Sequence, residues 1–337
     1  MSKISLLDCT LRDGGYVNDW QFGKEAIPEI IKDLEESKVD ILEIGFFKDE
    51  KYFPDRTVFN DAKQFAALVK NKIPSIKYAA MIEVVNPLPL ELLDPCDGKG
   101  ADIIRVIIWK RMLDEGFEYC KGIVEKGYKL CVQPARVDQY SDEEFVNMVK
   151  RFSQLDPMAI YVVDSWGSLN SPELLKYMHL ADENMPEGCS LGYHGHNTLM
   201  QASCVAQDFI HENFKRNIII DASIFGIGRG AGNLNTELIA KYLNENTDGK
   251  YNVLPMLKVY DKYIKAIYNQ TKWGYSVPFL MAATYHCNPN FASYYGEKLR
   301  LPTEHINGVL ASFGEDEKII YSQELADKKL EEYFKKK

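Results

Sequence analysis

The feature that most constrains the fold is a regular alternation of short apolar runs with amphipathic segments. We expect eight β-strands, at residues 4–9, 41–46, 78–82, 103–108, 129–133, 160–164, 191–196 and 218–223. Segments with helical periodicity lie between most of them, at 25–36, 61–70, 114–126, 142–154, 172–182 and 199–212. Strands that alternate with helices pair in parallel, and eight such units in about 220 residues predict a closed α/β barrel of the (β/α)8 (TIM) type. A doubly wound open sheet is the alternative.

The chain divides into two expected parts. Residues 1–245 form the predicted barrel, which carries the catalytic residues. Residues 246–337 read as helices and loops, with a clear amphipathic helix at 254–268. We expect this part to be a short helical C-terminal extension that covers the mouth of the barrel.

The composition is that of a soluble globular protein. The 337 residues are 46% hydrophobic and 12% aromatic, which is enough for a large packed core. A net charge of -9 argues against a general nucleic-acid binder, because the phosphate backbone requires a basic surface. No apolar run reaches membrane-spanning length, and the first residues do not resemble a signal peptide. The seven cysteines show no Cys-x-x-Cys spacing, so we expect reduced thiols and a cytoplasmic protein.

Unusual polar residues gather where the predicted strands end. They are Arg12 and Asp13 after the first strand, Glu43 in the second, Gln133 in the fifth, Asp164 and Ser165 at the sixth, and His194 and His196 in the seventh. A (β/α)8 enzyme builds its active site at the carboxyl ends of its strands. The clustering therefore predicts an active site there, which packing alone would not require.

Two histidines at one strand end point to a metal. Alternation along a strand turns His194 and His196 to the same side, so the two imidazoles can share one divalent cation. Asp13 can add a carboxylate and Arg12 a fixed positive charge. One aspartate and two histidines suit Mn²⁺, Mg²⁺, Fe²⁺, Co²⁺ or Zn²⁺, with open positions for a chelating substrate.

A 2-oxo acid is the natural chelator for such a site. The cation would withdraw electrons from the keto group and stabilise an enolate, and Arg12 would hold the developing oxyanion. Glu43 is either an ion-pair partner of Arg12 or a catalytic residue. Asp164 either holds a loop or contacts the substrate, and Gln133 and Ser165 are further candidates for substrate binding. Breaking a carbon-carbon bond also needs a base for the 4-hydroxyl proton.

Three motifs resemble the DRE-TIM metallolyase superfamily. They are Leu-Arg-Asp-Gly at 11–14, His-Gly-His-Asn at 194–197 and Gly-Ile-Gly-Arg-Gly-Ala-Gly-Asn at 226–233, and the likeness covers about residues 4–245. Within this HMGL-like group the glycine-rich loop is most similar to that of the 4-hydroxy-2-oxovalerate aldolases. The resemblance implies that Asp13, His194 and His196 bind the metal, most often Mn²⁺ or Mg²⁺, and that Asn233 reaches the metal or its water. It also implies an acylating aldehyde dehydrogenase as a partner. From the size of the barrel we expect a homo-oligomer.

One position departs from the aldolase pattern. The aldolases carry a histidine, their catalytic base, three residues after the metal-binding aspartate, and this chain has Tyr16 there. A tyrosine has an ordinary pKa of about 10 and is a poorer base at neutral pH. Tyr275 resembles a C-terminal tyrosine of the aldolases that reaches into the site. His286 is a substitute base or a core or surface residue.

The sequence thus predicts a divalent-metal-dependent carbon-carbon lyase, an aldolase that cleaves or forms a 4-hydroxy-2-oxo acid. One alternative is an acyl-CoA-using synthase or lyase of the same superfamily. Another is a barrel that keeps the metal site and has lost its catalysis, which the tyrosine at position 16 keeps open. A Schiff-base aldolase is disfavoured because the sixth strand ends without a lysine, and only Lys110 lies near a strand end.

Overall fold

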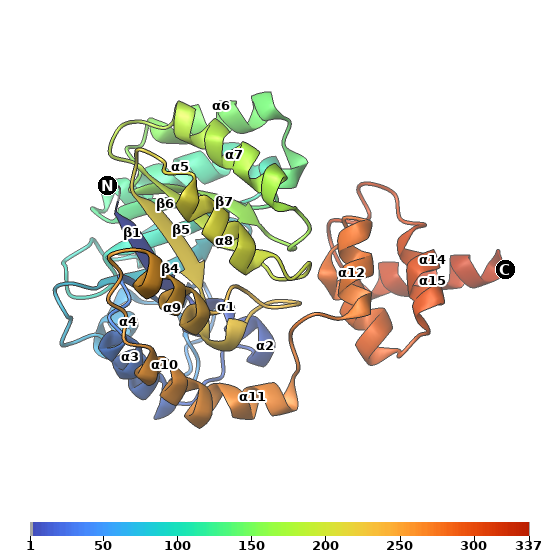
Figure 1. The fold of residues 1–337 in the computed structure, drawn as a ribbon, viewed down its shortest axis with the longest axis horizontal. Coiled ribbons are helices and arrows are strands. Elements are labelled where there is room, and N and C mark those ends of the chain that lie inside the picture. The colour runs from blue at the N-terminus through green and yellow to red at the C-terminus, as the bar shows by residue number, and fades with distance from the viewer. Residues whose placement is uncertain (1–2, 337) are drawn as a thin grey trace.

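The computed structural model describes residues 3–336 and contains a closed barrel of eight parallel strands (Figure 1). They are β1 Ile4–Asp8, β2 Ile41–Phe47, β4 Lys77–Glu83, β5 Ile103–Ile108, β6 Lys129–Pro134, β7 Ala159–Asp164, β8 Ser190–Gly195 and β9 Ile218–Ala222. Each predicted strand is found, with its ends displaced by at most one residue. β1 pairs with both β9 and β2, which closes the barrel and excludes the open-sheet alternative. The (β/α)8 prediction is confirmed.

A ninth strand, β3 at Val58–Phe59, pairs with the end of β2 and was not predicted. It is too short to show a periodic pattern. The eight barrel strands read as continuous apolar runs because both of their faces are buried. Alternate residues of β6 show this: Leu130 and Val132 pack outward against the helices, and Cys131 packs in the interior of the barrel.

Helices cover the outside of the barrel (Figure 1). They are α3 Ala26–Glu36, α4 Ala62–Leu68, α5 Leu113–Glu125, α6 Asp142–Ser153, α7 Ser171–Asn184, α8 Ala202–His211 and α9 Thr236–Asn246. Capping boxes begin two of them: Ser141 with Glu144 starts α6, and Asn170 with Glu173 starts α7. Between β4 and β5, where three prolines lie, the chain forms only the short 3₁₀ turn Leu90–Leu92.

The C-terminal part is helical, as expected, and packs in two groups. The first contains α10 at Val253–Val259, a π-helical turn at Tyr260–Ile264 and α11 at Lys265–Gln270, and it shares the core of the barrel. The second contains α12 Val277–Thr284, α13 Pro289–Ser293, a π-helical turn Tyr294–Lys298, α14 Thr303–Leu310 and α15 Gln323–Lys335. This second group has its own core, and we call it the C-terminal helical unit.

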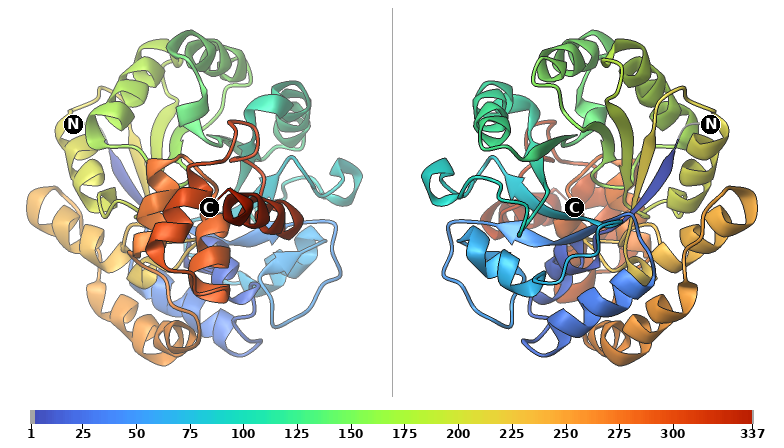
Figure 2. Two further views of the ribbon diagram at one scale, coloured as in Figure 1. Left: turned by 90° about the vertical axis from the view of Figure 1, so that its right-hand side faces the viewer. Right: turned by 90° about the vertical axis from the view of Figure 1, so that its left-hand side faces the viewer.

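The C-terminal helical unit lies over one end of the barrel (Figure 2, left). Its Asn288 accepts a hydrogen bond from Arg229 in the loop after β9, and its His286 lies 3.9 Å from Asp138 in the loop after β6. Both loops follow the carboxyl ends of strands, so the unit covers the end where the polar residues gather. The division at 245 stays a prediction, and its outer limits, residues 1, 2 and 337, lie outside the described residues. Within residues 3–336, no helix has both the length and the apolar character needed to cross a membrane.

Gly192 in β8 makes room for a tyrosine beneath the strand ends. A Cβ atom at this position would lie 2.4 Å from ring atoms of Tyr161, which is fully buried. We expect Gly192→Ala to lower the free energy of unfolding by about 1–3 kcal/mol, because overpacking forces the ring or the strand to move. Urea titration measures this effect. Gly100→Ala is the matched control, since its Cβ would make only ordinary contacts at 3.5 Å; equal stability of the two variants would contradict the packing argument.

Candidate metal centre

A short helical turn after β1 places Arg12 and Asp13 over the end of the barrel. This turn is α1, Thr10–Asp13, and it is followed directly by α2, Gly15–Asn18. Asp8, the last residue of β1, accepts hydrogen bonds from the backbone N–H and the hydroxyl of Thr10 and from the hydroxyl of Thr236. These hydrogen bonds hold the turn in place. Within it, Arg12 is 3% exposed and Asp13 is 1% exposed.

Asp13, His194 and His196 converge at this place. The Nε2 atoms of His194 and His196 lie 4.0 and 3.6 Å from Oδ2 of Asp13. One ligand atom from each of the three residues lies within 4.8 Å of the other two. In the part of the chain that the structure describes, this is the one group of its kind. Two segments far apart in the sequence, α1 and the end of β8 with the loop that follows it, therefore form a common site.

Hydrogen bonds turn the free Nε2 atoms of both histidines toward Asp13. Nδ1 of His194 lies 2.9 Å from Oδ2 of Asp221, and Nδ1 of His196 lies 3.1 Å from the backbone carbonyl oxygen of Asp164. Both partners are acceptors, so we assign the proton to Nδ1 and the lone pair to Nε2 in each ring. Burial lowers the pKa of His194, which favours the neutral imidazole that binds metals.

The charges and unpartnered atoms of this cluster fit a divalent cation. Its ion pairs link the carboxylates of Asp13, Glu43 and Asp221 with the guanidinium groups of Arg12 and Arg105, and none of the five is more than 3% exposed. Three carboxylates therefore face two guanidinium groups, and an uncompensated charge is costly in the interior. Nε2 of His196 is also buried without a hydrogen-bond partner. A cation held by Asp13, His194 and His196 would satisfy both features.

Asn233, the last residue of the glycine-rich loop, lies against the same carboxylate. Its Nδ2 donates to Oδ2 of Asp13, and its Oδ1 is buried without a partner. A Cβ on Gly228 would lie 2.3 Å from Nδ2 of Asn233 and 2.8 Å from Oδ2 of Asp13. The loop thus approaches the site with its backbone, and the predicted role of Asn233 at the metal remains a proposal.

Arg12 is oriented by two carboxylates. Its Nε donates to Glu43 and its Nη1 to Asp13, both at 2.6 Å. Burial disfavours its charge, but the two carboxylates outweigh burial and hold the pKa of Arg12 above its usual range. Burial likewise disfavours the charge of Asp13, and Arg12 with the two histidines still holds its pKa below the usual range. Glu43 is thus an ion-pair partner of Arg12, and a catalytic role for it remains only a prediction.

Two charged residues of this cluster were missed in the sequence. Arg105 lies in the middle of β5 and Asp221 in β9, and both are at most 1% exposed. The sequence contained a signal that could have identified them, because each is the single charged residue of an otherwise apolar strand. A charge in such a strand needs a buried partner.

The residues predicted to bind substrate mainly hold loops. The Asp164 carboxylate accepts hydrogen bonds from the backbone N–H groups of Ser168 and Leu169. These bonds agree with the first of its two predicted roles, in which it holds a loop. The Ser165 hydroxyl accepts one from the backbone N–H of Arg136. Gln133 is 3% exposed, and its Nε2 is buried without a partner, so its amide keeps a free donor.

The two candidate tyrosines differ in their surroundings. Tyr16 packs edge-on against Trp20 and Phe46, at ring distances of 5.0 and 6.1 Å. Although 37% of Tyr16 is exposed, the dense protein around its phenol and the charge of Glu83 raise its pKa above the usual range. Tyr16 is therefore a neutral hydrogen-bond donor at neutral pH. Tyr275 lies between α11 and α12 and is 50% exposed, so its catalytic role remains a prediction.

Asp8 beneath the turn should make stability depend on pH. Burial raises its pKa from 3.8 to about 6. The folded state therefore binds a proton more readily than the unfolded state, so this contribution to stability is greatest below pH 4 and is lost as the pH rises to about 6. We compare the free energy of unfolding of the wild type with that of Asp8→Asn. The wild-type value minus the variant value should fall by on the order of 2–3 kcal/mol between pH 4 and pH 7. Urea titrations across this range measure it, with the exposed Asp114→Asn as control; a constant difference would contradict the raised pKa.

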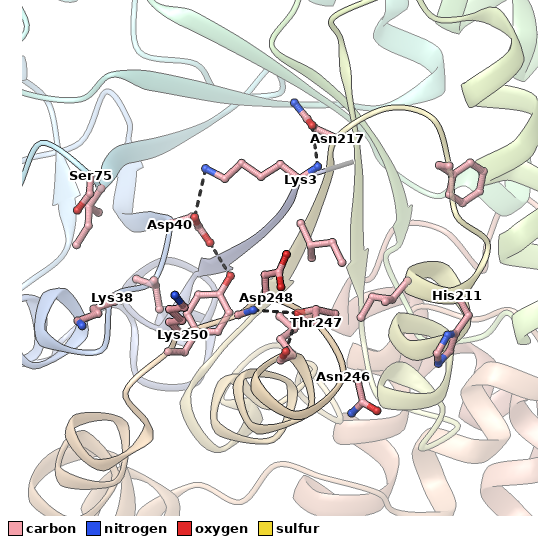
Figure 3. Close-up of a pocket in the computed structure, with 18 of the residues that line it drawn as sticks. Lys3, Lys38, Asp40, Ser75, His211, Asn217, Asn246, Thr247, Asp248 and Lys250 are labelled. Atoms are coloured by element: carbon pink, nitrogen blue, oxygen red, sulfur yellow. Dashed lines mark hydrogen bonds and ion pairs between the residues drawn. The ribbon is translucent and has the colours of Figure 1, made fainter. Parts of the chain in front are cut away.

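A large cavity lies at the opposite end of the barrel (Figure 3). It measures about 1600 Å³ and opens between the segments that precede β1, β2 and β9. Lys3, Asp40 and Asn217 lie on its wall, and Lys3 bonds to both of the others. Both acidic and basic side chains line the cavity, so it does not favour a ligand of one particular charge. Size alone does not identify the functional site here, whereas the converging ligand atoms do.

Part of this chain matches a model of a known protein family. The HMGL-like family model matches residues 110–261, which include both histidines of the metal centre. The match covers just under half of the chain, and it confirms the resemblance to the DRE-TIM superfamily that the three motifs indicated.

Two relatives align over somewhat more than two thirds of this chain. An oxaloacetate decarboxylase of Mycobacterium tuberculosis is 25% identical over 254 residues, which cover 71% of this chain and 69% of that protein. A 4-hydroxy-2-oxovalerate aldolase of Bacillus cereus is 24% identical over 246 residues, with 72% and 70% covered. Together with the Asp13 centre, these similarities support a metal-dependent lyase at the level of the superfamily.

Solved structures show the same fold as this chain. The N-terminal domain of a Bacteroides vulgatus protein, provisionally assigned as an aldolase, superposes with a TM-score of 0.75 at 23% identity over 88% of this chain and 99% of that one. The carboxyl transferase domain of Rhizobium etli pyruvate carboxylase gives 0.72 at 14% identity, over 100% of this chain and 62% of that one. At these identities the likeness concerns the fold alone.

Proposed function

We propose that this protein is a divalent-metal-dependent aldolase that cleaves a 4-hydroxy-2-oxo acid into a 2-oxo acid and an aldehyde, or forms it from them. The observation that carries the proposal is the convergence of the two free Nε2 atoms of His194 and His196 on Asp13, with Arg12 bonded to the same carboxylate. The similarity to 4-hydroxy-2-oxovalerate aldolases supports the substrate class. A divalent cation held there would supply Lewis-acid polarisation of the 2-oxo group.

Arg12 has a donor left for the substrate. Its Nε and Nη1 are taken by Glu43 and Asp13, whereas no partner in residues 3–336 bonds to its Nη2. In cleavage the 4-hydroxyl loses its proton, the C3–C4 bond breaks and its electron pair moves toward the C2 oxygen before C3 takes up a proton. Arg12 Nη2 would donate to that oxygen as negative charge develops on it. Because Glu43 and Asp13 fix the guanidinium beforehand, no reorganisation is needed at that moment.

The proton of the 4-hydroxyl needs an acceptor, and Tyr16, at the position of the expected histidine, is not that acceptor while its phenol is protonated. With its pKa raised, the phenol is protonated at neutral pH and can donate a hydrogen bond to the leaving carbonyl oxygen. His286, the substitute base named from the sequence, is the candidate for this acceptor. Its side chain is 52% exposed on the C-terminal helical unit and lies 3.9 Å from Asp138. We propose Tyr16 as the group that contacts the aldehyde oxygen.

A coupled assay tests this proposal. The protein with Mn²⁺ is given a panel of 4-hydroxy-2-oxo acids, and release of pyruvate or another 2-oxo acid is followed. Turnover with at least one member is expected, and Asp13→Asn protein serves as the blank for metal-catalysed background. No 2-oxo acid release from any member of the panel would contradict the proposal.

Decarboxylation of oxaloacetate is a second candidate function. The relative from Mycobacterium tuberculosis carries this name. Loss of the C4 carboxylate of oxaloacetate as CO₂ breaks the C3–C4 bond and moves its electron pair toward the C2 oxygen, as in aldol cleavage, but it needs no base for a hydroxyl proton, which suits a neutral Tyr16. CO₂ release above the Asp13→Asn blank, without aldol cleavage, would favour this function. An acylating aldehyde dehydrogenase partner and a homo-oligomer remain part of the aldolase proposal.

A further inference from the structure

Arg105 contacts both halves of the metal centre from the interior of the barrel. It is fully buried; its Nη1 lies 2.8 Å from Oε2 of Glu43, and its Nη2 pairs with Oδ2 of Asp221. The same Oε2 atom accepts from Nε of Arg12 at 2.6 Å, and the same Oδ2 atom lies 2.9 Å from Nδ1 of His194. One guanidinium therefore joins the carboxylate behind Arg12 to the carboxylate behind His194, through one shared oxygen on each side.

We propose that Arg105 is a positioning residue that fixes His194 relative to Arg12 and thereby sets the affinity of the site for its divalent cation. This inference rests on the proposed function, because it takes the Asp13 centre to be a metal site. Among the described residues, the ion pairs of Arg105 go to Glu43 and Asp221 and to none of the three predicted metal ligands. It acts through Asp221, which orients the His194 ring, and through Glu43, which orients the Arg12 guanidinium.

The guanidinium of Arg105 packs against a buried aromatic ring. Its Cζ lies 4.8 Å from the ring centre of Tyr161, which is itself fully buried, and Gly192 leaves the room that this ring fills. A buried ion pair often contributes no more stability than apolar side chains of the same volume. The packing of the barrel therefore does not require an arginine here, whereas holding two carboxylates at a fixed separation does, because only the guanidinium fork reaches both.

Arg105→Lys tests the proposal, because it keeps the positive charge and removes the fork. We expect the variant to fold, to bind Mn²⁺ about 10-fold more weakly in calorimetric titrations, and to change the visible absorption spectrum of the Co²⁺-loaded protein. Arg151→Lys is the matched control: its Arg151–Asp114 pair is exposed, and Mn²⁺ affinity and the Co²⁺ spectrum should stay as in the wild type. If Arg105→Lys does not fold, the double variant Arg105→Gln, Glu43→Gln removes one charge of each sign, and the same weakening is expected.

The outcomes separate this inference from the proposed function. A folded Arg105 variant with wild-type Mn²⁺ affinity and an unchanged Co²⁺ spectrum overturns the positioning role and leaves Arg105 a purely structural residue. Wild-type protein that binds Mn²⁺ and cleaves no oxo acid contradicts the aldolase proposal, while the weaker binding of the variant would still support the role of Arg105. Wild-type protein that binds neither Mn²⁺ nor Co²⁺ overturns both.

Discussion

Asp13→Asn is expected to weaken Mn²⁺ binding by at least ~100-fold, more than any change in the outer residues of the site. Asp13 is the one residue that faces both histidines with Oδ2 and Arg12 with Oδ1. The amide is nearly isosteric, so packing is kept, but its charge is lost and one of its two polar atoms becomes a donor. The cluster would then hold two carboxylates and two guanidinium groups, and its need for a cation would disappear.

Calorimetric titration with Mn²⁺ measures this effect, and thermal unfolding in the absence of metal checks that the variant folds. Asp114→Asn, on the exposed surface, is the control and should bind as the wild type does. An Asp13→Asn protein that keeps wild-type affinity would show that the cation binds elsewhere.

Arg12→Lys is expected to reduce kcat by about 10²–10³-fold while Mn²⁺ affinity changes by only a few-fold. The guanidinium uses Nε for Glu43 and Nη1 for Asp13 and keeps Nη2 for the substrate, which makes three directions from one rigid plane. A lysine has one nitrogen at the end of a flexible chain and cannot serve all three. The loss should fall on kcat rather than KM, because the charge on the substrate oxygen develops in the transition state.

Steady-state kinetics with the oxo acid that gives turnover, together with Mn²⁺ titration of the same preparation, separates the two effects. Arg56→Lys is the matched control, since Arg56 bonds to Asp19 at the surface of the barrel. A kcat within about threefold of the wild type would remove Arg12 from the proposed chemistry.

The fold could be predicted almost entirely from the sequence. Strands of a parallel barrel are buried on both faces, so each appears as a continuous apolar run that ends at a polar residue such as Asp8 or Asp164. The exception, Val58–Phe59, is held by its neighbour β2 rather than by a pattern of its own.

The site could be predicted less completely, for a physical reason. Asp13, His194 and His196 carry recognisable chemistry at strand ends, and the barrel brings those ends together. Arg105 and Asp221 are 116 positions apart, and their pairing depends on the register of the closed barrel, which no local pattern shows. The same holds for Glu43 and Asp164, whose two roles were left open until their partners were known.

The most direct test of the metal centre is anomalous diffraction from a crystal soaked with Mn²⁺ and oxalate, a stable analogue of the chelating 2-oxo acid end. We predict one strong anomalous peak bound by Asp13 and by Nε2 of His194 and His196, with oxalate in the open positions and Nη2 of Arg12 donating to it. A peak at any other place, or none at saturating Mn²⁺, would contradict the account.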